Sequence, residues 1–182
     1  MLTIIAAPKT FFMRKYLFLF FFLLKISFTY CQDQTQLVRT PYKLKVVVTK
    51  DITYEEDIQA TPYVLPKNTI QLYPGEKIYV EVEQENSEIK SMTAVKEIKD
   101  SSKTLIISFI QTVKKKAQES IMLNIHNPFS TRLIYDAQIY LFAQKKWDNT
   151  DVYPVEAGAS GIEIWHDIIT SIGLGHWKFQ AK

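Results

Sequence analysis

Apolar and polar residues alternate along most of the chain after residue 41. The alternation is clearest over five stretches, 44–48, 78–83, 104–112, 120–126 and 132–142. Because successive side chains of a β-strand point to opposite faces, a period of two predicts strands that bury one face. Helical periodicity is weak, and only residues 54–60 and 164–170 fit a helical turn or two.

The stretch 132–142 predicts most sharply which side chains share a face. Its core face is expected to hold four side chains at every second position: Leu133, Tyr135, Ala137 and Ile139. Its opposite face is expected to hold Ile134, Asp136 and Gln138. A register shift of one residue would turn the whole apolar set toward solvent, so this assignment is a strict test of the fold.

Turn residues separate the alternating stretches. Tyr73-Pro74-Gly75-Glu76 predicts a β-turn between two strands, because proline presets its second position and glycine accepts a positive φ. Residues 99–102 predict a second turn, and Asn127-Pro128 ends a strand because proline cannot sit in a central ladder. The basic run 114–116 is interpreted as the solvated end of a hairpin.

Seven to nine short strands with turns every 8–12 residues predict an all-β fold, an antiparallel β-sandwich. An Ig-like Greek key is the expected arrangement, and a jelly roll is the alternative. The sandwich is expected to be a single domain over residues 42–182, after a flexible lead-in over residues 32–41.

The first 31 residues have the pattern of a secretory signal peptide. Arg14 and Lys15 precede nine consecutive apolar or aromatic residues, 16–24, and a polar step begins at Lys25. A membrane span needs about 20 apolar residues, which favours a signal peptide over 1–31 and leaves an uncleaved anchor as the alternative. Translation starts at Met1 or at Met13, which directly precedes the basic pair.

Cys31, the only cysteine, ends this leader. The bulky Tyr30 before it disfavours lipid attachment and favours cleavage after Cys31, which leaves Gln32 as the first residue; a lipoprotein is the alternative. In both cases the mature domain has no cysteine pair and no internal disulfide. We expect an exported protein, periplasmic or extracellular, that meets a membrane only through its leader or a lipidated Cys31.

Charge excludes one class of partner. The leader holds four of the 22 basic residues and none of the 19 acidic ones, so the remaining chain carries 18 bases against 19 acids. The formal net charge of +3 therefore belongs to the leader. The domain lacks the basic excess of a nucleic-acid-binding protein, and nucleic acid is not an expected partner.

Catalytic, metal and cofactor motifs are missing. The three histidines, His126, His166 and His176, have no cysteine or histidine at metal-ligand spacing. Gly158-Ala159-Ser160-Gly161 lacks the last glycine of a nucleophile elbow. We therefore predict no catalytic residue, metal or cofactor. A hydrolase assembled from distant residues is the remaining enzymatic alternative, with His126, Asp136 and Glu163 as its candidates.

Three tryptophans lie near the C-terminus. We expect Trp165 and Trp177 in the core and Trp147 at the surface, since large aromatics commonly close the ends of such domains. Trp147 and Tyr153 are therefore the candidate contacts for a ligand or partner.

Several stretches in the last third resemble an uncharacterised group of small secreted or periplasmic bacterial proteins of Bacteroidetes type. Those stretches are 123–129, 133–137, 152–155, 163–165 and 174–179, and the likeness departs at His176-Trp177. The resemblance implies an exported protein with a C-terminal sandwich domain, and it points to no functional site. The expected function is non-enzymatic binding or structural association with an envelope protein or polysaccharide. A carbohydrate-binding module that uses exposed aromatics is the alternative.

Overall fold

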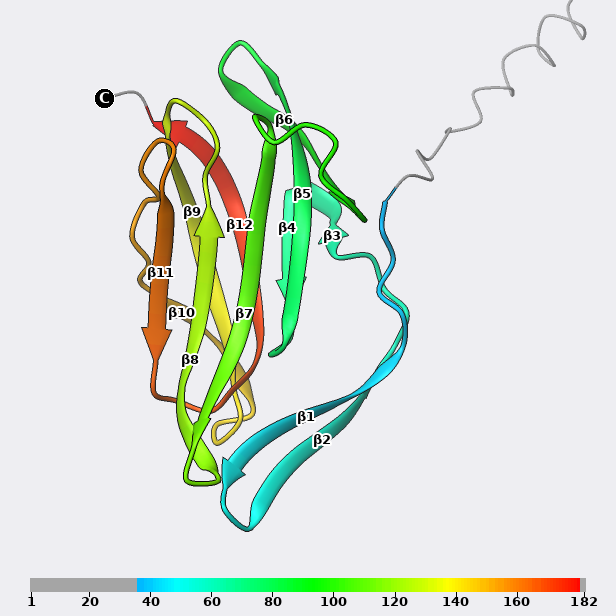
Figure 1. Cartoon of the computed structure of the whole chain (residues 1–182), viewed down its shortest axis with the longest axis vertical. Helices are drawn as coiled ribbons and strands as arrows, with labels where there is room; N and C mark the ends of the chain where they lie inside the picture. Colours follow the sequence, from blue (N-terminus) through cyan, green and yellow to red (C-terminus); the bar gives the residue numbers. More distant parts are fainter. Residues whose placement is uncertain (1–35, 181–182) are drawn as a thin grey trace, which may run out of the picture. The chain divides into compact units, whose positions relative to one another are not determined.

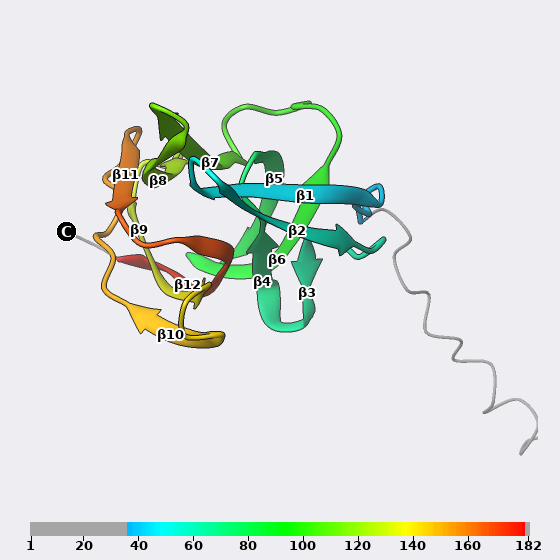
Figure 2. The same ribbon diagram turned by 90° about the horizontal axis from the view of Figure 1, so that it is seen from below.

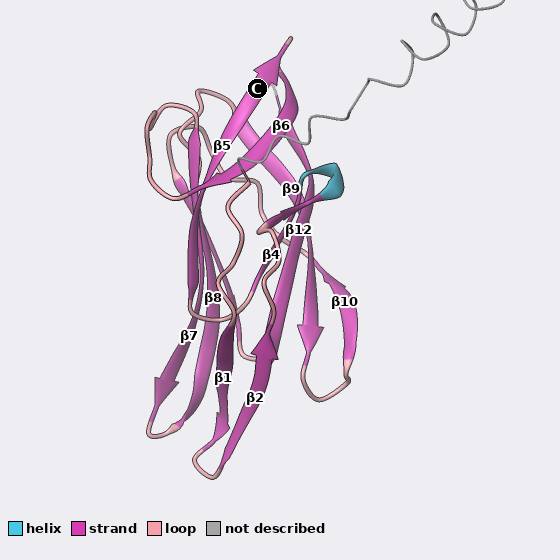
Figure 3. Cartoon of the chain, turned by 90° about the vertical axis from the view of Figure 1, so that its right-hand side faces the viewer, coloured by secondary structure: helices cyan, strands magenta, loops and turns pink. Residues whose placement is uncertain are grey.

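The computed structural model describes residues 36–180, so the predicted signal peptide and Cys31 lie outside the described residues. This part forms twelve β-strands and one short 3-10 helix, η1 (Pro66–Asn68) (Figures 1 and 3). The strands are β1 (Tyr42–Thr49), β2 (Ile52–Ile58), β3 (Val64–Leu65), β4 (Thr69–Leu72), β5 (Glu76–Glu85), β6 (Glu88–Val95), β7 (Thr104–Lys114), β8 (Ala117–His126), β9 (Arg132–Leu141), β10 (Lys146–Thr150), β11 (Ser160–Trp165) and β12 (Ile169–Gln180). Within residues 36–180, no helix has the length and apolar character to cross a membrane.

Ten strands form two five-stranded sheets that face each other (Figure 1). One, called here the β9 sheet, has the order β10-β9-β12-β4-β3, and the other, the β8 sheet, has the order β11-β8-β7-β5-β6. All pairs are antiparallel, which confirms the predicted antiparallel β-sandwich. The last strand, β12, lies between β9 and β4, so the chain crosses between sheets as in Greek-key folds.

The core lies between the inner faces of the two sheets and follows the alternation of the sequence. Along β9, Leu133, Tyr135, Ala137 and Ile139 are buried, and Asp136 and Gln138 are exposed, which confirms the predicted register. Trp177 of β12 is 7 % exposed, and its ring stacks on Tyr135 with centroids 5.0 Å apart. The predicted turn is also present, with Gly75 at φ 96° and the amide of Glu76 hydrogen-bonded to the carbonyl of Tyr73.

The β1–β2 hairpin closes one end of the sandwich (Figure 2). Its buried residues Leu44, Val46 and Ile58 form a small separate cluster with Tyr73 and Ile168. The backbone of Val47 exchanges two hydrogen bonds, of 2.8 and 3.0 Å, with the side-chain amide of Gln111 on β7. Tyr54 of β2 meets Phe142, directly after β9, edge-to-face at 5.4 Å. The hairpin therefore contacts both sheets.

Two expectations about local structure are wrong. Residues 54–60 and 164–170 form no helical turns: the first lies mainly in β2, and the second spans the end of β11 and the start of β12. In β2, pairing of Tyr54 with Val46 and of Ile58 with Tyr42 overrides the weak helical spacing.

A flexible lead-in is expected over residues 32–41, and its described part, residues 36–41, makes specific contacts with the sandwich. The amide of Leu37 donates to the carbonyl of Ala94 on the outer edge of β6, and the side chain of Gln36 bonds both Met92 and Ala94. Arg39 is 1 % exposed. The polar composition of this segment was misleading because its charged group is buried against a partner that lies 37 residues away.

Candidate functional site

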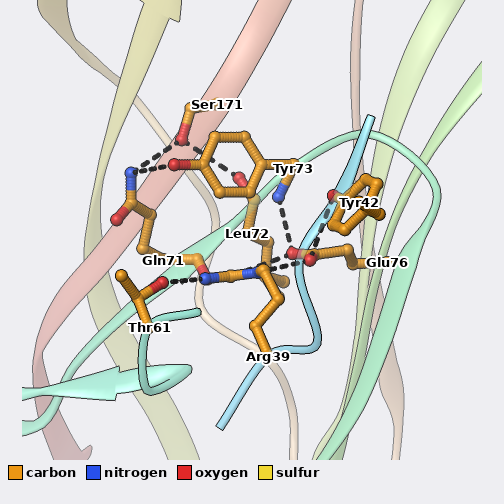
Figure 4. A network of polar contacts seen from close by, with 8 residues as sticks. All are labelled: Arg39, Tyr42, Thr61, Gln71, Leu72, Tyr73, Glu76 and Ser171. Atoms are coloured by element: carbon orange, nitrogen blue, oxygen red, sulfur yellow. Dashed lines mark hydrogen bonds and ion pairs between the residues drawn. The ribbon is translucent and has the colours of Figure 1, made fainter. Parts of the chain in front are cut away.

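A buried polar cluster surrounds Arg39, where the lead-in meets the turn between β4 and β5 (Figure 4). The guanidinium donates to both carboxylate oxygens of Glu76, from Nε at 2.6 Å and Nη2 at 3.1 Å. It also donates to the Thr61 hydroxyl at 2.6 Å and to the Gln71 carbonyl at 2.9 Å. The carboxylate of Glu76 accepts further bonds from the Tyr42 hydroxyl at 3.1 Å and the Tyr73 amide at 2.9 Å.

The cluster, here called the Arg39 cluster, has a structural role. Arg39 lies over the rings of Tyr63 and Tyr73, at 4.4 and 4.9 Å. Burial raises the pKa of Tyr42, Tyr63 and Tyr73, and the charge of Glu76 adds to the effect. With its charged groups paired and covered, the cluster offers no surface to a ligand; it joins the lead-in to both sheets.

The candidate residues of the enzymatic alternative lie in different parts of the sandwich. His126 lies on the outer face of the β8 sheet, Asp136 lies on the outer face of the β9 sheet, and Glu163 accepts a 2.7 Å hydrogen bond from the Tyr153 amide at the edge of β11. The core of the sandwich separates His126 from Asp136. These three side chains do not converge on one site.

Ser160 and His126 do lie together on neighbouring strands, with Oγ and Nδ1 3.2 Å apart. A serine nucleophile also needs an acid that orients the histidine. Within residues 36–180, His126 has no hydrogen bond to a carboxylate, and Ser160 opens a strand rather than a nucleophile elbow. The pair is an exposed cross-strand contact.

The two aromatic residues predicted to contact a ligand lie in different parts of the surface. Trp147 is on β10, at the outer face of the β9 sheet, and is 43 % exposed. Tyr153 is 80 % exposed and lies in the connection between β10 and β11. Trp165 is half-buried, with its indole N–H donating to the Thr150 hydroxyl at 3.0 Å. Only Trp147 adjoins a recess in the surface.

This recess, of about 230 Å³, is set into the outer face of the β9 sheet. Its floor is made by Gly173 and Gly175 of β12, which place no side chain over the sheet. The ring atom Cζ3 of Trp147 lies 3.8 Å from where a Cβ atom of Gly173 would stand. Since β9 separates β10 from β12, the indole reaches across β9 to the glycine floor. The polar lining comes from Asp136, Gln138, Asn149 and His176, together with Lys67 and Thr69.

The polar side chains of the recess hold one another in place and keep hydrogen-bonding atoms free. The Gln138 amide donates to the Asn149 oxygen at 2.9 Å. His176 Nδ1 lies 2.8 Å from Asp136 Oδ2, and since a carboxylate can only accept, Nδ1 is the donor. Among the described residues, Asn149 Nδ2, Gln138 Oε1, Asp136 Oδ1 and His176 Nε2 have no protein partner.

The backbone at the recess is strained. His176 has φ 52°, and it is the one non-glycine residue of residues 36–180 with positive φ inside a strand; the others are in η1 or in connections. It lies in a bulge of β12, where the register with β9 shifts between Gly175 and Lys178. The next residue, Trp177, has the only buried side-chain polar atom without a partner in this part of the chain, Nε1. Such local costs tend to gather at functional sites.

Sequence reasoning found Trp147 but missed the rest of this recess. Asp136 and Gln138 were assigned to the outer face of β9, yet nothing in the sequence placed Asn149 and His176 beside them. The register supplies this, because Gln138 pairs with Asn149 and Gly173, and Asp136 pairs with Gly175. Two glycines separated by one residue within a long strand were the one usable signal.

The described residues contain no group of three or more histidine, cysteine or acidic side chains that would hold a metal ion. No protein-family model matches the sequence, and no curated protein or solved structure matches it either. The resemblance of the last third to secreted bacterial sandwich proteins therefore stays a prediction.

Proposed function

We propose that this chain is an exported, non-enzymatic β-sandwich protein that binds its ligand on the outer face of the β9 sheet. The observation that carries this proposal is the recess beside Trp147, with its exposed indole, backbone floor and free hydrogen-bonding atoms. Concave sites that combine apolar surface with a few convergent polar groups are the usual form of ligand sites.

Binding rather than catalysis is favoured by what surrounds His176. Its one hydrogen bond among the described residues is to Asp136, and no hydroxyl or thiol there is hydrogen-bonded to the imidazole, as an activated nucleophile would be. The leader pattern supports export, since a basic pair, a short apolar run and a polar exit precede the domain.

The binding site is tested without assuming the ligand. Protein purified after expression of the full chain is screened by amide NMR against a mixed set of fragments containing monosaccharides, nucleosides, amino acids and dicarboxylates. We expect shifts concentrated at the amides of Gly173, Gly175 and His176. Fragments that shift only amides of the β8 sheet, or none that shift the recess, would overturn the proposal.

Export is tested by N-terminal sequencing and intact mass of the protein recovered outside the cytoplasm. We expect a first residue at Gln32. A retained leader would contradict export with cleavage, and a diacylglycerol-modified Cys31 would replace the soluble form with a lipoprotein.

A further inference from the structure

We propose that the ligand of this recess is a neutral carbohydrate chain, with one sugar ring on Trp147 and the next above Gly173 and Gly175. This inference rests on the proposed function, because it names the ligand class of the same site. The assignment follows from the aromatic surface, the mixture of donors and acceptors, the glycine floor and the charge of the recess.

Trp147 provides a flat apolar surface next to polar groups. Its ring is kept in place by the edge-to-face contact with Tyr140, with centroids 5.5 Å apart and planes at 69°, and by the approach to Gly173. A sugar ring presents an apolar face of C–H groups and a rim of hydroxyls. An indole that is held against a sheet and exposed at 43 % matches the apolar face.

The free polar atoms match the hydroxyl rim. A sugar hydroxyl donates one hydrogen bond and accepts others, so a site for adjacent hydroxyls needs donors and acceptors side by side. The recess supplies Asn149 Nδ2 as a donor and Asp136 Oδ1 and Gln138 Oε1 as acceptors. The two internal bonds, Gln138–Asn149 and His176–Asp136, orient these atoms before a ligand arrives, which reduces the entropy lost on binding.

The floor and the size of the recess fit a ring that lies flat on the sheet. Neither Gly173 nor Gly175 places a Cβ atom of its own over the backbone; the Trp147 ring borders the floor at Gly173, and a Cβ atom at Gly175 would stand 3.7 Å from the Thr69 hydroxyl. The volume of about 230 Å³ is below the range of roughly 300–1,000 Å³ typical for drug-sized ligands. The recess therefore accommodates one ring of a chain whose neighbouring ring lies on Trp147.

Charge argues against the other common ligand classes. Lys67 and Asp136 contribute one charge of each sign to the lining, and no arginine takes part. Nucleic acids and acidic polymers require an excess of basic groups. A lipid or other apolar ligand would cover the amides, the carboxylate and the imidazole of this recess without giving them hydrogen-bond partners, which is costly.

The strained bulge places His176 where the ligand would lie. In regular β-structure, residues 175, 176 and 177 would alternate between the faces; the bulge instead sends Trp177 inward and leaves His176 exposed beside Asp136. Positive φ is costly for a residue with a side chain, and such strain inside a strand is consistent with a role of His176 in binding.

The test is calorimetric titration of the purified exported protein with five neutral hexasaccharides: β1,4-linked glucose, xylose, mannose and N-acetylglucosamine, and α1,4-linked glucose. Polygalacturonate and a single-stranded oligonucleotide are the charged comparators. We expect at least one neutral hexasaccharide to bind with a Kd of about 1 mM or tighter. Its Kd should change less than about twofold between low and high salt, because no net charge is neutralised.

Variants locate that binding in the recess. Trp147→Ala should weaken it about tenfold or more, Trp147→Phe should retain part of it, and Asp136→Asn should weaken it several-fold. Tyr153→Ala is the matched control, an exposed aromatic outside the recess, and should leave the Kd unchanged. Melting midpoints of all variants separate lost binding from lost folding.

Three outcomes would overturn the inference. These are no binding of any neutral hexasaccharide, tighter binding of a charged comparator, or binding that survives both Trp147→Ala and Asp136→Asn. If fragments still shift the amides of Gly173 and Gly175, the ligand class is wrong while the proposed binding site stands. If neither fragments nor sugars reach the recess, both proposals fall.

Discussion

The Arg39 cluster and the recess beside Trp147 are both polar, and each contains a hydrogen-bonded side-chain pair that includes a carboxylate, yet they differ in how many polar atoms lack a protein partner. In the Arg39 cluster, the guanidinium and the Glu76 carboxylate bond four neighbouring atoms and each other, and both side chains are buried. In the recess, His176 and Asp136 share one hydrogen bond and keep their other polar atoms exposed. A closed polar network supports the fold, whereas an open one is available to bind a ligand.

The largest expected effect on stability comes from removing Arg39. Arg39→Ala leaves the Glu76 carboxylate buried without its partner, and removing one member of a buried pair costs about 3–5 kcal/mol. We expect a loss of that size in the free energy of unfolding, measured by urea denaturation. The domain that remains folded should bind its ligand as before.

The double variant Arg39→Met/Glu76→Leu is the control, since replacing both charges by apolar groups removes the unpaired carboxylate. It should recover most of the lost stability. A loss below about 1 kcal/mol for Arg39→Ala would show that the cluster does not hold the lead-in to the sandwich.

The order of the lead-in shows a limit of reading the sequence. Residues 32–40 are mostly polar and precede the first alternating stretch, so composition predicts solvent exposure. The partner that buries Arg39 is Glu76, and nothing local connects these two positions. By contrast, the faces of β9 follow from a period of two that is written in Leu133, Tyr135, Ala137 and Ile139 themselves.

The second prediction concerns alkaline titration of the buried tyrosines. Burial raises the pKa of Tyr42, Tyr63 and Tyr73 in the native Arg39 cluster above the ordinary value of 10.0 that applies in the unfolded chain. Burial and the hydrogen bond to Glu56 also raise the pKa of Tyr54 in the hairpin to about 12.

Native tyrosines thus keep their protons when unfolded ones would lose them. Their contribution to stability is fully present below pH 10 and is lost as the pH rises through the raised native values. We expect the free energy of unfolding to fall steadily above pH 10. Phenolate absorbance should rise over the same pH range. Equal titration of all tyrosines with no loss of stability would contradict the buried cluster.

The third prediction concerns Trp147, whose removal should separate binding from stability. The side chain is half-exposed and packs on Tyr140 and Gly173, so Trp147→Ala should cost only about 1 kcal/mol of unfolding free energy. Trp177→Ala, in the core on the next strand but one, should cost about 3–5 kcal/mol. Denaturation curves of the two variants measure the contrast, and equal losses would show that Trp147 is part of the core.

Sequence reasoning reached Trp147 because a surface tryptophan is unusual by itself. It could not assemble the recess, whose members Asn149, Asp136 and His176 come from three strands that the register alone aligns. The bulge that exposes His176 cannot be recognised from the neighbouring residues either, since the sequence around His176 is compatible with a regular β-strand. The face of a sheet can be predicted from alternation; the neighbours across strands depend on topology.

The smallest expected effect on stability, and the sharpest on function, comes from His176→Gly. Glycine adopts φ 52° without the steric cost that an L side chain incurs, which is about 1–2 kcal/mol. It gives back roughly 0.5–1 kcal/mol through the greater backbone freedom of the unfolded chain, and the exposed His176–Asp136 pair adds little. The free energy of unfolding should therefore change by less than about 1 kcal/mol. Binding should weaken several-fold, because Asp136 loses the hydrogen bond that orients it and the ligand loses the imidazole.

His176→Val, which cannot adopt this φ without strain, should instead lower stability measurably. If His176→Gly is no more stable than the parent and binds the ligand equally well, the bulge has only a structural role. The contrast between the closed Arg39 cluster and the open recess would then rest on Trp147.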